Sequence, residues 1–214
     1  STYKFLTVDS LSGFTAICEV TEMTEKLVCK LVNSFVEYQF IQEQSREEYC
    51  YRMLCTLETV ITVCSMFLIA LFWGNVIEGM FFCAFFFGLR SRTGGFHLQS
   101  FRKCYVCSLL VYIAVLACGE ISTQISSKLI WPVIGISAWI ICAIGTVNHS
   151  GWNLDREELK ASKRCARYIV IFEAVTLCFM GWLHIEKSII VCSGMGMVVC
   201  AALLLVARIA ARRK

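Results

Sequence analysis

The stretch SIIVCSGMGMVVCAALLLVA, residues 188–207, contains no charged side chain. A helix of about 20 apolar residues crosses the hydrocarbon core of a bilayer, so this stretch predicts a transmembrane helix. Five further apolar segments precede it, at about 53–73, 76–89, 104–118, 129–147 and 168–183. The whole chain is 57% hydrophobic and only 17% charged, which is unusual for a soluble domain. The sequence therefore predicts an all-α integral membrane protein with six transmembrane helical segments.

The basic residues alternate with these segments. Of the 20 Lys and Arg residues, all but Lys128 and Lys187 lie in 1–52, 90–103, 148–167 or the C-terminal tail. Loops that remain in the cytoplasm carry the excess of Lys and Arg, so both termini and the 90–103 stretch are predicted to be cytoplasmic. The net charge of +4 is too small to favour nucleic acid, and we expect no such partner.

The region before the first segment predicts an amphipathic helix within residues 22–52. Apolar side chains recur there at helical spacing, at Met23, Leu27, Leu31, Phe35 and Tyr38. Such a helix lies in the membrane interface or packs on the cytoplasmic ends of the bundle, and the sequence leaves both open. Residues 1–21 form an unplaced N-terminal extension, and 22–214 are expected to be one domain.

The stretch that carries chemistry is RSRTGGFHLQSFRKC, residues 90–104. Gly94 and Gly95 permit backbone conformations that are closed to other residues. His97 can exchange a proton near neutral pH, and Cys104 stands at a membrane boundary that water can reach. An imidazole can take the proton of a thiol and later give one to a leaving amine. The stretch therefore holds a candidate base and a candidate nucleophile.

Cationic neighbours favour the thiolate form of a cysteine. Around Cys104 these are Arg90, Arg92, Arg102 and Lys103. On a straight helix His97 and Cys104 would share a face but lie about 10 Å apart, so we expect the Gly-Gly turn to bring His97 back, or a substrate to bridge the gap. The residues alone equally fit a structural histidine and a cysteine that only fills space.

Two other features are weaker. Cys104 and Cys107 form a C-x-x-C pair, but no second pair or histidine cluster accompanies it, so we expect no metal and no cofactor. Glu58 and Glu78 lie within or near apolar segments, where a carboxylate is costly. They either orient His97 or pair with Arg90, or they are structural.

The order Arg90, Gly94-Gly95-Phe96-His97 and Cys104 resembles the pattern of the AgrB family, the accessory gene regulator membrane peptidases of Gram-positive bacteria. The likeness runs roughly from residue 23 to residue 190. It implies that Cys104 is the nucleophile of a cysteine endopeptidase and His97 its acid and base. Arg90 belongs to the same motif, as a residue that orients the site or binds a carbonyl or carboxylate.

The resemblance also implies the substrate. It would be an AgrD-type precursor peptide whose acidic tail is removed through a thioester on Cys104, after which the core closes to a thiolactone or lactone. A multi-pass homodimer in a bacterial cell membrane, in contact with lipid, is implied as well. The residues leave two other readings open, a peptide transporter and a non-catalytic membrane receptor or scaffold.

Overall fold

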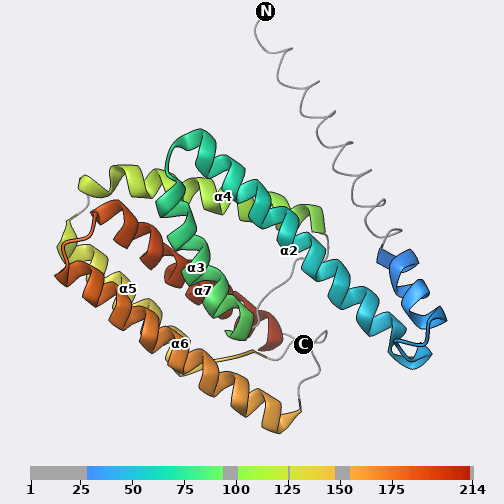
Figure 1. Cartoon of the computed structure of the whole chain (residues 1–214). Coiled ribbons are helices and arrows are strands. Elements are labelled where there is room, and N and C mark those ends of the chain that lie inside the picture. The colour runs from blue at the N-terminus through green and yellow to red at the C-terminus, as the bar shows by residue number, and fades with distance from the viewer. Residues whose placement is uncertain (1–27, 94–100, 125, 148–154, 213–214) are drawn as a thin grey trace, which may run out of the picture. The chain divides into compact units, whose positions relative to one another are not determined.

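The computed structural model describes residues 28–93, 101–124, 126–147 and 155–212, and these are helical with no strand among them. Residues 28–37 are helical at the start of the described chain. The elements that follow are η1 (Glu43–Ser45), α2 (Arg46–Trp73), α3 (Val76–Thr93), α4 (Phe101–Glu120), η2 (Ile121–Thr123), α5 (Ser127–Ile144), α6 (Arg156–Trp182) and α7 (Lys187–Arg212). Figure 1 labels the α-helices among them. The all-α prediction is confirmed.

The predicted number of membrane-spanning helices needs correction. Among the described residues, four helices are long and apolar enough to cross a membrane, not six: Arg52–Trp73, Lys103–Glu120, Arg156–Trp182 and Lys187–Ala210. In α3 the apolar run between Glu78 and Arg90 is only about 17 Å long, well short of a hydrocarbon core of about 30 Å. The apolar part of α5, Lys128–Ile144, is also too short.

A helix does lie within the stretch 22–52 that was predicted to be an amphipathic helix, at residues 28–37, but it does not continue into α2. The helix at residues 28–37 ends in a turn, where Gln39 has a φ of +60°, and α2 starts at Arg46. Val28 and Val32 form the buried face. The predicted apolar stripe is exposed instead, through Leu31, Phe35 and Tyr38. A membrane interface can take up such exposed apolar side chains.

The chain groups into two compact units. One comprises Ser1–Cys64 and Leu98–Ser108, and the other comprises Ser65–His97 and Leu109–Lys214. The N-terminal parts of α2 and α4 therefore belong to the first unit and their C-terminal parts to the second. The expectation of one domain over 22–214 stays a prediction.

Helix α7 is the centre of the second unit. It contacts α3, α5 and α6, and 56% of its membrane-spanning window is buried, against 11% for α2. Its residues Met197 and Leu204 are almost completely buried in the core. A Cβ atom at Gly196 would lie 3.0 Å from the backbone nitrogen of Phe86, so only glycine allows α7 to pack this closely on α3.

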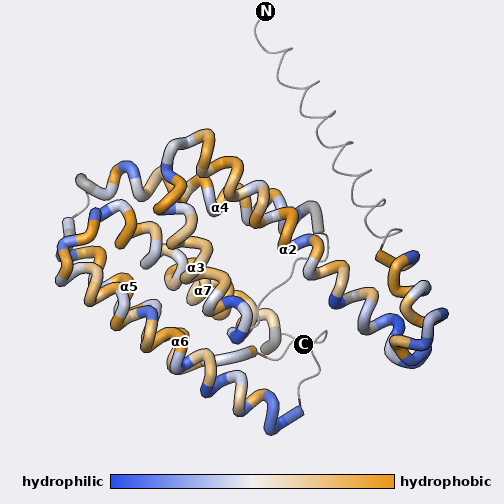
Figure 2. Tube along the Cα trace, viewed as in Figure 1, coloured by the Kyte–Doolittle hydropathy of each residue, from blue (hydrophilic) through white to orange (hydrophobic). Residues whose placement is uncertain are grey.

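The outer surface of the helices is apolar along much of its length. Phe72 is 91% exposed, Phe172 is 71% exposed and Trp182 is 72% exposed. The hydropathy along α6 changes in Figure 2 from hydrophilic in its first turns to mostly hydrophobic over its remaining length. A soluble protein would not leave so much contiguous apolar surface in water, whereas lipid covers it without cost.

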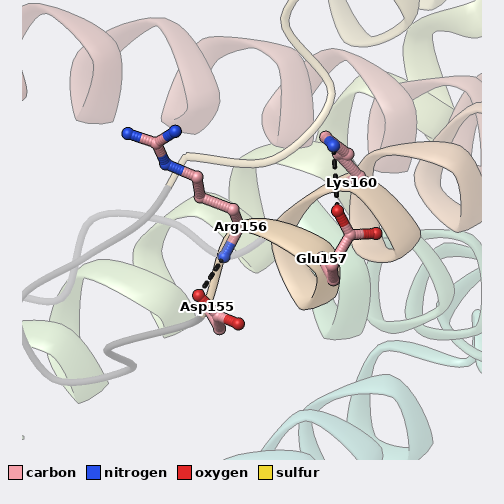
Figure 3. Close-up of polar contacts among 4 residues, drawn as sticks. All are labelled: Asp155, Arg156, Glu157 and Lys160. Carbon is pink, nitrogen blue, oxygen red and sulfur yellow. Dashed lines mark hydrogen bonds and ion pairs between the residues drawn. The ribbon is translucent and has the colours of Figure 1, made fainter.

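Helix α6 begins inside the predicted 148–167 loop because its first turn is strongly capped. The Asp155 carboxylate accepts a hydrogen bond from the backbone nitrogen of Arg156 at 2.7 Å, and the Glu158 side chain accepts one from the backbone nitrogen of Asp155. Lys160 pairs with Glu157 at 2.9 Å (Figure 3). Acidic residues stabilise the N-terminal end of a helix. With 27 residues, about 40 Å, α6 is longer than the hydrocarbon core, so its charged first turns reach into water.

Candidate functional site

Cys104 lies in the first turn of α4, which begins at Phe101. Its side chain is half-buried, that of the preceding Lys103 is exposed, and Cys107, one turn further along, is exposed. All three belong to the first compact unit, together with Glu58 of α2. The thiol of Cys104 therefore stands at the electropositive end of a helix, next to a lysine, with part of its surface accessible.

The other half of the predicted pair cannot be placed in the same way. His97, Gly94 and Gly95 lie outside the described residues. The approach of the imidazole to the Cys104 thiol therefore stays a prediction from the sequence. The structure does describe where α3 ends before this stretch and where α4 starts after it.

Arg90 and Arg92 lie in the last turn of α3, in the second unit. Of the two, Arg90 belongs to the family pattern. Its side chain is half-buried, whereas that of Arg92 is exposed.

The carboxyl end of α3 is held by two hydroxyl groups that are distant in sequence. The carbonyl oxygen of Arg92 accepts hydrogen bonds from Thr146 Oγ1 at 2.8 Å and from Ser162 Oγ at 2.9 Å. The backbone nitrogen of Val147 donates to the carbonyl of Thr93 at 3.3 Å. These bonds fasten the residues directly before Gly94 to the segment after α5 and to α6. No sequence signal marks Thr146 or Ser162, since the contacts are non-local.

The position of Thr146 depends on the residue before it. Gly145 ends α5 with a φ of +71°, and its backbone nitrogen donates to the carbonyl of Ile141 at 2.7 Å. A Cβ atom there would also lie 3.0 Å from Cγ of Lys163 on α6. Glycine is therefore required both by the left-handed backbone and by the close approach of α6.

Removing both hydroxyls that bind Arg92 should loosen this end of α3. We expect Thr146→Val combined with Ser162→Ala to lower the free energy of unfolding by about 1–3 kcal/mol, because a carbonyl in the last turn of α3, which has no partner within its own helix, loses two hydrogen bonds. Denaturation by dodecyl sulfate in mixed micelles, followed by circular dichroism, measures the change. Thr176→Val is the matched control, since this hydroxyl only bonds to Phe172 within its own helix. Equal losses of unfolding free energy in both proteins would show that the two hydroxyl groups do not hold the carboxyl end of α3.

The two acidic candidates differ. Glu78 lies in the first turn of α3, twelve residues before Arg90 and so about 18 Å away along one helix. It cannot pair with Arg90, which corrects that hypothesis, and its carboxylate accepts a hydrogen bond from Ser188 Oγ at 3.1 Å. Glu58 is half-buried in the same unit as Cys104. A third acidic residue, Glu173 of α6, is 6% exposed, and its Oε2 has no hydrogen-bond partner among the described residues.

A shallow groove of about 560 Å³ lies at the other end of the helices. Its lining consists of Ile69, Phe72, Trp73, Ile113 and Glu120. The indole nitrogen of Trp73 donates to the Glu120 carboxylate at 2.5 Å. Glu120 is sixteen residues from Cys104 on α4, about 24 Å along the axis, so this groove is separate from the candidate nucleophile.

Comparison with known proteins gives one match. The model of the family described as accessory gene regulator B matches residues 28–207, which is most of the chain. No curated protein and no solved structure matches significantly. The matched region begins where the described residues begin and includes both Cys104 and the end of α3.

Proposed function

The chain belongs to the accessory gene regulator B family, whose members are membrane proteins that process quorum-sensing peptides, and on this premise we propose that it is a membrane cysteine endopeptidase. It removes the C-terminal tail of an AgrD-type precursor and promotes closure of the remaining core to a thiolactone or lactone. Cys104 is the nucleophile and His97 is the general base and acid. The protein acts as a homodimer at the cytoplasmic face of a bacterial membrane.

The placement of Cys104 is the observation that carries this proposal. Its thiol is half-buried in the first turn of α4, so a peptide can reach it. The N-terminal end of a helix stabilises negative charge, and the adjacent Lys103 adds a positive one. Cys104 is thus accessible at the start of a helix and next to a lysine, a position in which an attacking cysteine can meet a peptide.

The reaction then follows from thiol chemistry. His97 takes the proton of Cys104, the sulfur attacks the carbonyl at the junction of core and tail, and His97 protonates the nitrogen of the departing tail. The core remains bound to Cys104 as a thioester. A cysteine or serine of the core gives its proton to His97 and attacks this thioester, which closes the ring and releases Cys104 as the thiolate. Ring closure is fast because the nucleophile is held next to the acyl group, and the membrane surface limits competing hydrolysis.

Charge supports an acidic tail as the leaving part of the substrate. Arg92 and Lys103 are exposed at the ends of α3 and α4 that flank the His97 stretch. By contrast, Lys160 is already paired with Glu157. We therefore assign the tail-binding role to Lys103, next to Cys104, whose ammonium group binds carboxylates. Contact with anionic lipid headgroups uses the same chemistry in the absence of substrate.

The thioester is the intermediate that tests the mechanism directly. The purified chain in lipid nanodiscs is mixed with a synthetic precursor whose core cysteine or serine is replaced by alanine, so that the ring cannot close. Peptide mass spectrometry should then find the core attached to Cys104, and hydroxylamine should release it as a hydroxamate. His97→Ala should lower the yield of this adduct, whereas His184→Ala, at the start of the turn between α6 and α7, should not. An adduct on another cysteine would refute Cys104 as the nucleophile.

Substitutions of Glu58 and Glu78 should have different effects on the rate of tail release. We expect Glu58→Gln to lower the rate of tail release by about 10- to 100-fold, because a carboxylate near a catalytic histidine fixes its orientation and stabilises its charged form. Glu78→Gln should leave the rate within about twofold, since Glu78 lies at the far end of α3 and binds Ser188. Initial rates with a fluorescent tail measure both. Equal effects would show that Glu58 has no special relation to the site.

A further inference from the structure

Two cysteines form a pair in the first unit, away from the candidate active site. Cys29 lies in the helix at residues 28–37, and Cys50 lies in the second turn of α2. Arg46 Nε donates a hydrogen bond to Asn33 Oδ1 at 2.8 Å, which joins these two helices. Cys29 lies one helical turn before Asn33, and Cys50 lies one turn after Arg46. The two cysteines are therefore on the helix faces that this bond brings together.

This pair is accessible to water-soluble reagents. Cys29 is exposed and Cys50 is partly exposed, and both precede the first candidate membrane span, which starts at Arg52. Partial burial raises the pKa of the Cys50 thiol, and the neighbouring Cys29 raises it further. Cys50 therefore keeps its proton, which leaves the exposed sulfur of Cys29 as the first target of an oxidant.

No other described pair combines these properties. Cys118 and Cys192 both lie inside candidate membrane spans, from which polar oxidants are excluded. Cys104 and Cys107 are one helical turn apart on α4, a spacing that permits a disulfide, but they belong to the candidate active site and not to a separate one.

We propose that Cys29 and Cys50 are a reversible oxidation site, at which peroxide closes a disulfide that ties the helix at residues 28–37 to α2. The sulfur of Cys29 attacks hydrogen peroxide, breaks the O–O bond and becomes a sulfenic acid, with release of water. The sulfur of Cys50 then attacks the sulfenic sulfur, and the hydroxyl leaves as a second water. Two thiols lose two electrons and two protons, and one peroxide is reduced to two waters. Excess small-molecule thiol reverses the bond by exchange.

The sequence around the pair makes the product simple to detect. Trypsin cuts after Lys26 and Lys30 and after Arg46 and Arg52, which places the two cysteines in the separate peptides LVCK and EEYCYR. The full-length chain in nanodiscs is treated with hydrogen peroxide, blocked with N-ethylmaleimide and digested without reductant. We expect the two peptides to be recovered mainly as one disulfide-linked species, which dithiothreitol separates. Recovery of both as maleimide adducts would overturn the proposal.

Two cysteine variants distinguish a specific disulfide between Cys29 and Cys50 from unspecific oxidation. Cys165→Ser removes an exposed cysteine on α6 and should leave the linked species unchanged, whereas Cys50→Ser should abolish it. Dibromobimane, which bridges only neighbouring thiols, should link the same two peptides in the unoxidised protein without any substitution. Disulfide links from Cys29 to many different cysteines, or to Cys29 of a second chain, would contradict a specific pairing of Cys29 with Cys50. The same link is expected in Cys104→Ala protein, so this result is independent of the peptidase mechanism.

Discussion

Replacing Cys104 by alanine is expected to abolish release of the precursor tail, with a rate reduced by about a thousandfold or more. Covalent catalysis is lost completely when its nucleophile is removed, and the remaining groups cannot form the thioester. Co-expression of the chain with a tagged precursor, followed by gel electrophoresis, measures the released tail. The variant should still bind the precursor, because Lys103 is unchanged and Cys104 is only half-buried.

Cys107→Ala is the control for this variant. Cys107 is exposed, lies on the same helix one turn after Cys104, and has no role in the proposed reaction. Its loss should change tail release by less than about twofold. Persistent release in the Cys104 variant would show that another group is the nucleophile. Loss of precursor binding as well as release would point instead to a fold defect, which circular dichroism would detect.

The second large effect is expected in the core. Gly196→Leu should lower the free energy of unfolding by about 3 kcal/mol, because the new side chain meets the backbone of α3 at Phe86 and Phe82 rather than a movable side-chain end. The helices must then separate, and α7 loses its close packing. Denaturation by dodecyl sulfate in mixed micelles, followed by circular dichroism, gives the difference from the parent protein.

A second glycine provides the comparison. Gly135 on α5 is exposed, and no atom lies within 4 Å of the position a Cβ would take. Gly135→Leu should be neutral or stabilising, since leucine has the higher helix propensity and the surface there is apolar. Equal destabilisation at both positions would show that the close approach of α3 and α7 contributes little.

Much of the fold could be predicted from hydropathy, because each long apolar segment became a helix. The predictions of helix boundaries and buried faces were wrong where helix capping or packing, and not hydropathy, determines the structure. Helix α6 starts at Arg156, before its apolar part, because a capping box stabilises a charged turn that hydropathy reads as a loop. The helix at residues 28–37 buries Val28 and Val32 rather than the more prominent stripe. Periodicity identified an amphipathic segment but not the turn at Gln39 that interrupts it.

The candidate site was only partly predictable. The motif identifies Cys104 and Arg90 because their spacing is local, and α4 indeed presents Cys104 in its first turn. The fastening of Arg92 by Ser162 joins residues 70 positions apart, and such contacts leave no trace in one sequence. The proposed pairing of Glu78 with Arg90 was wrong because the 18 residues of α3 form one continuous helix, which keeps these two residues at opposite ends.

The central place of α7 has a consequence for biosynthesis. Translation proceeds from the N-terminus, so the ribosome releases this helix after α3, α5 and α6 have already been inserted. Until then the earlier helices wait in the bilayer with their mutual contacts incomplete, and Glu78 lacks Ser188. The nascent protein therefore depends on lipid, or on an insertase that shelters polar groups, for the interval before α7 arrives. Any stop codon upstream of residue 187 would leave a set of spans without the partner around which they assemble.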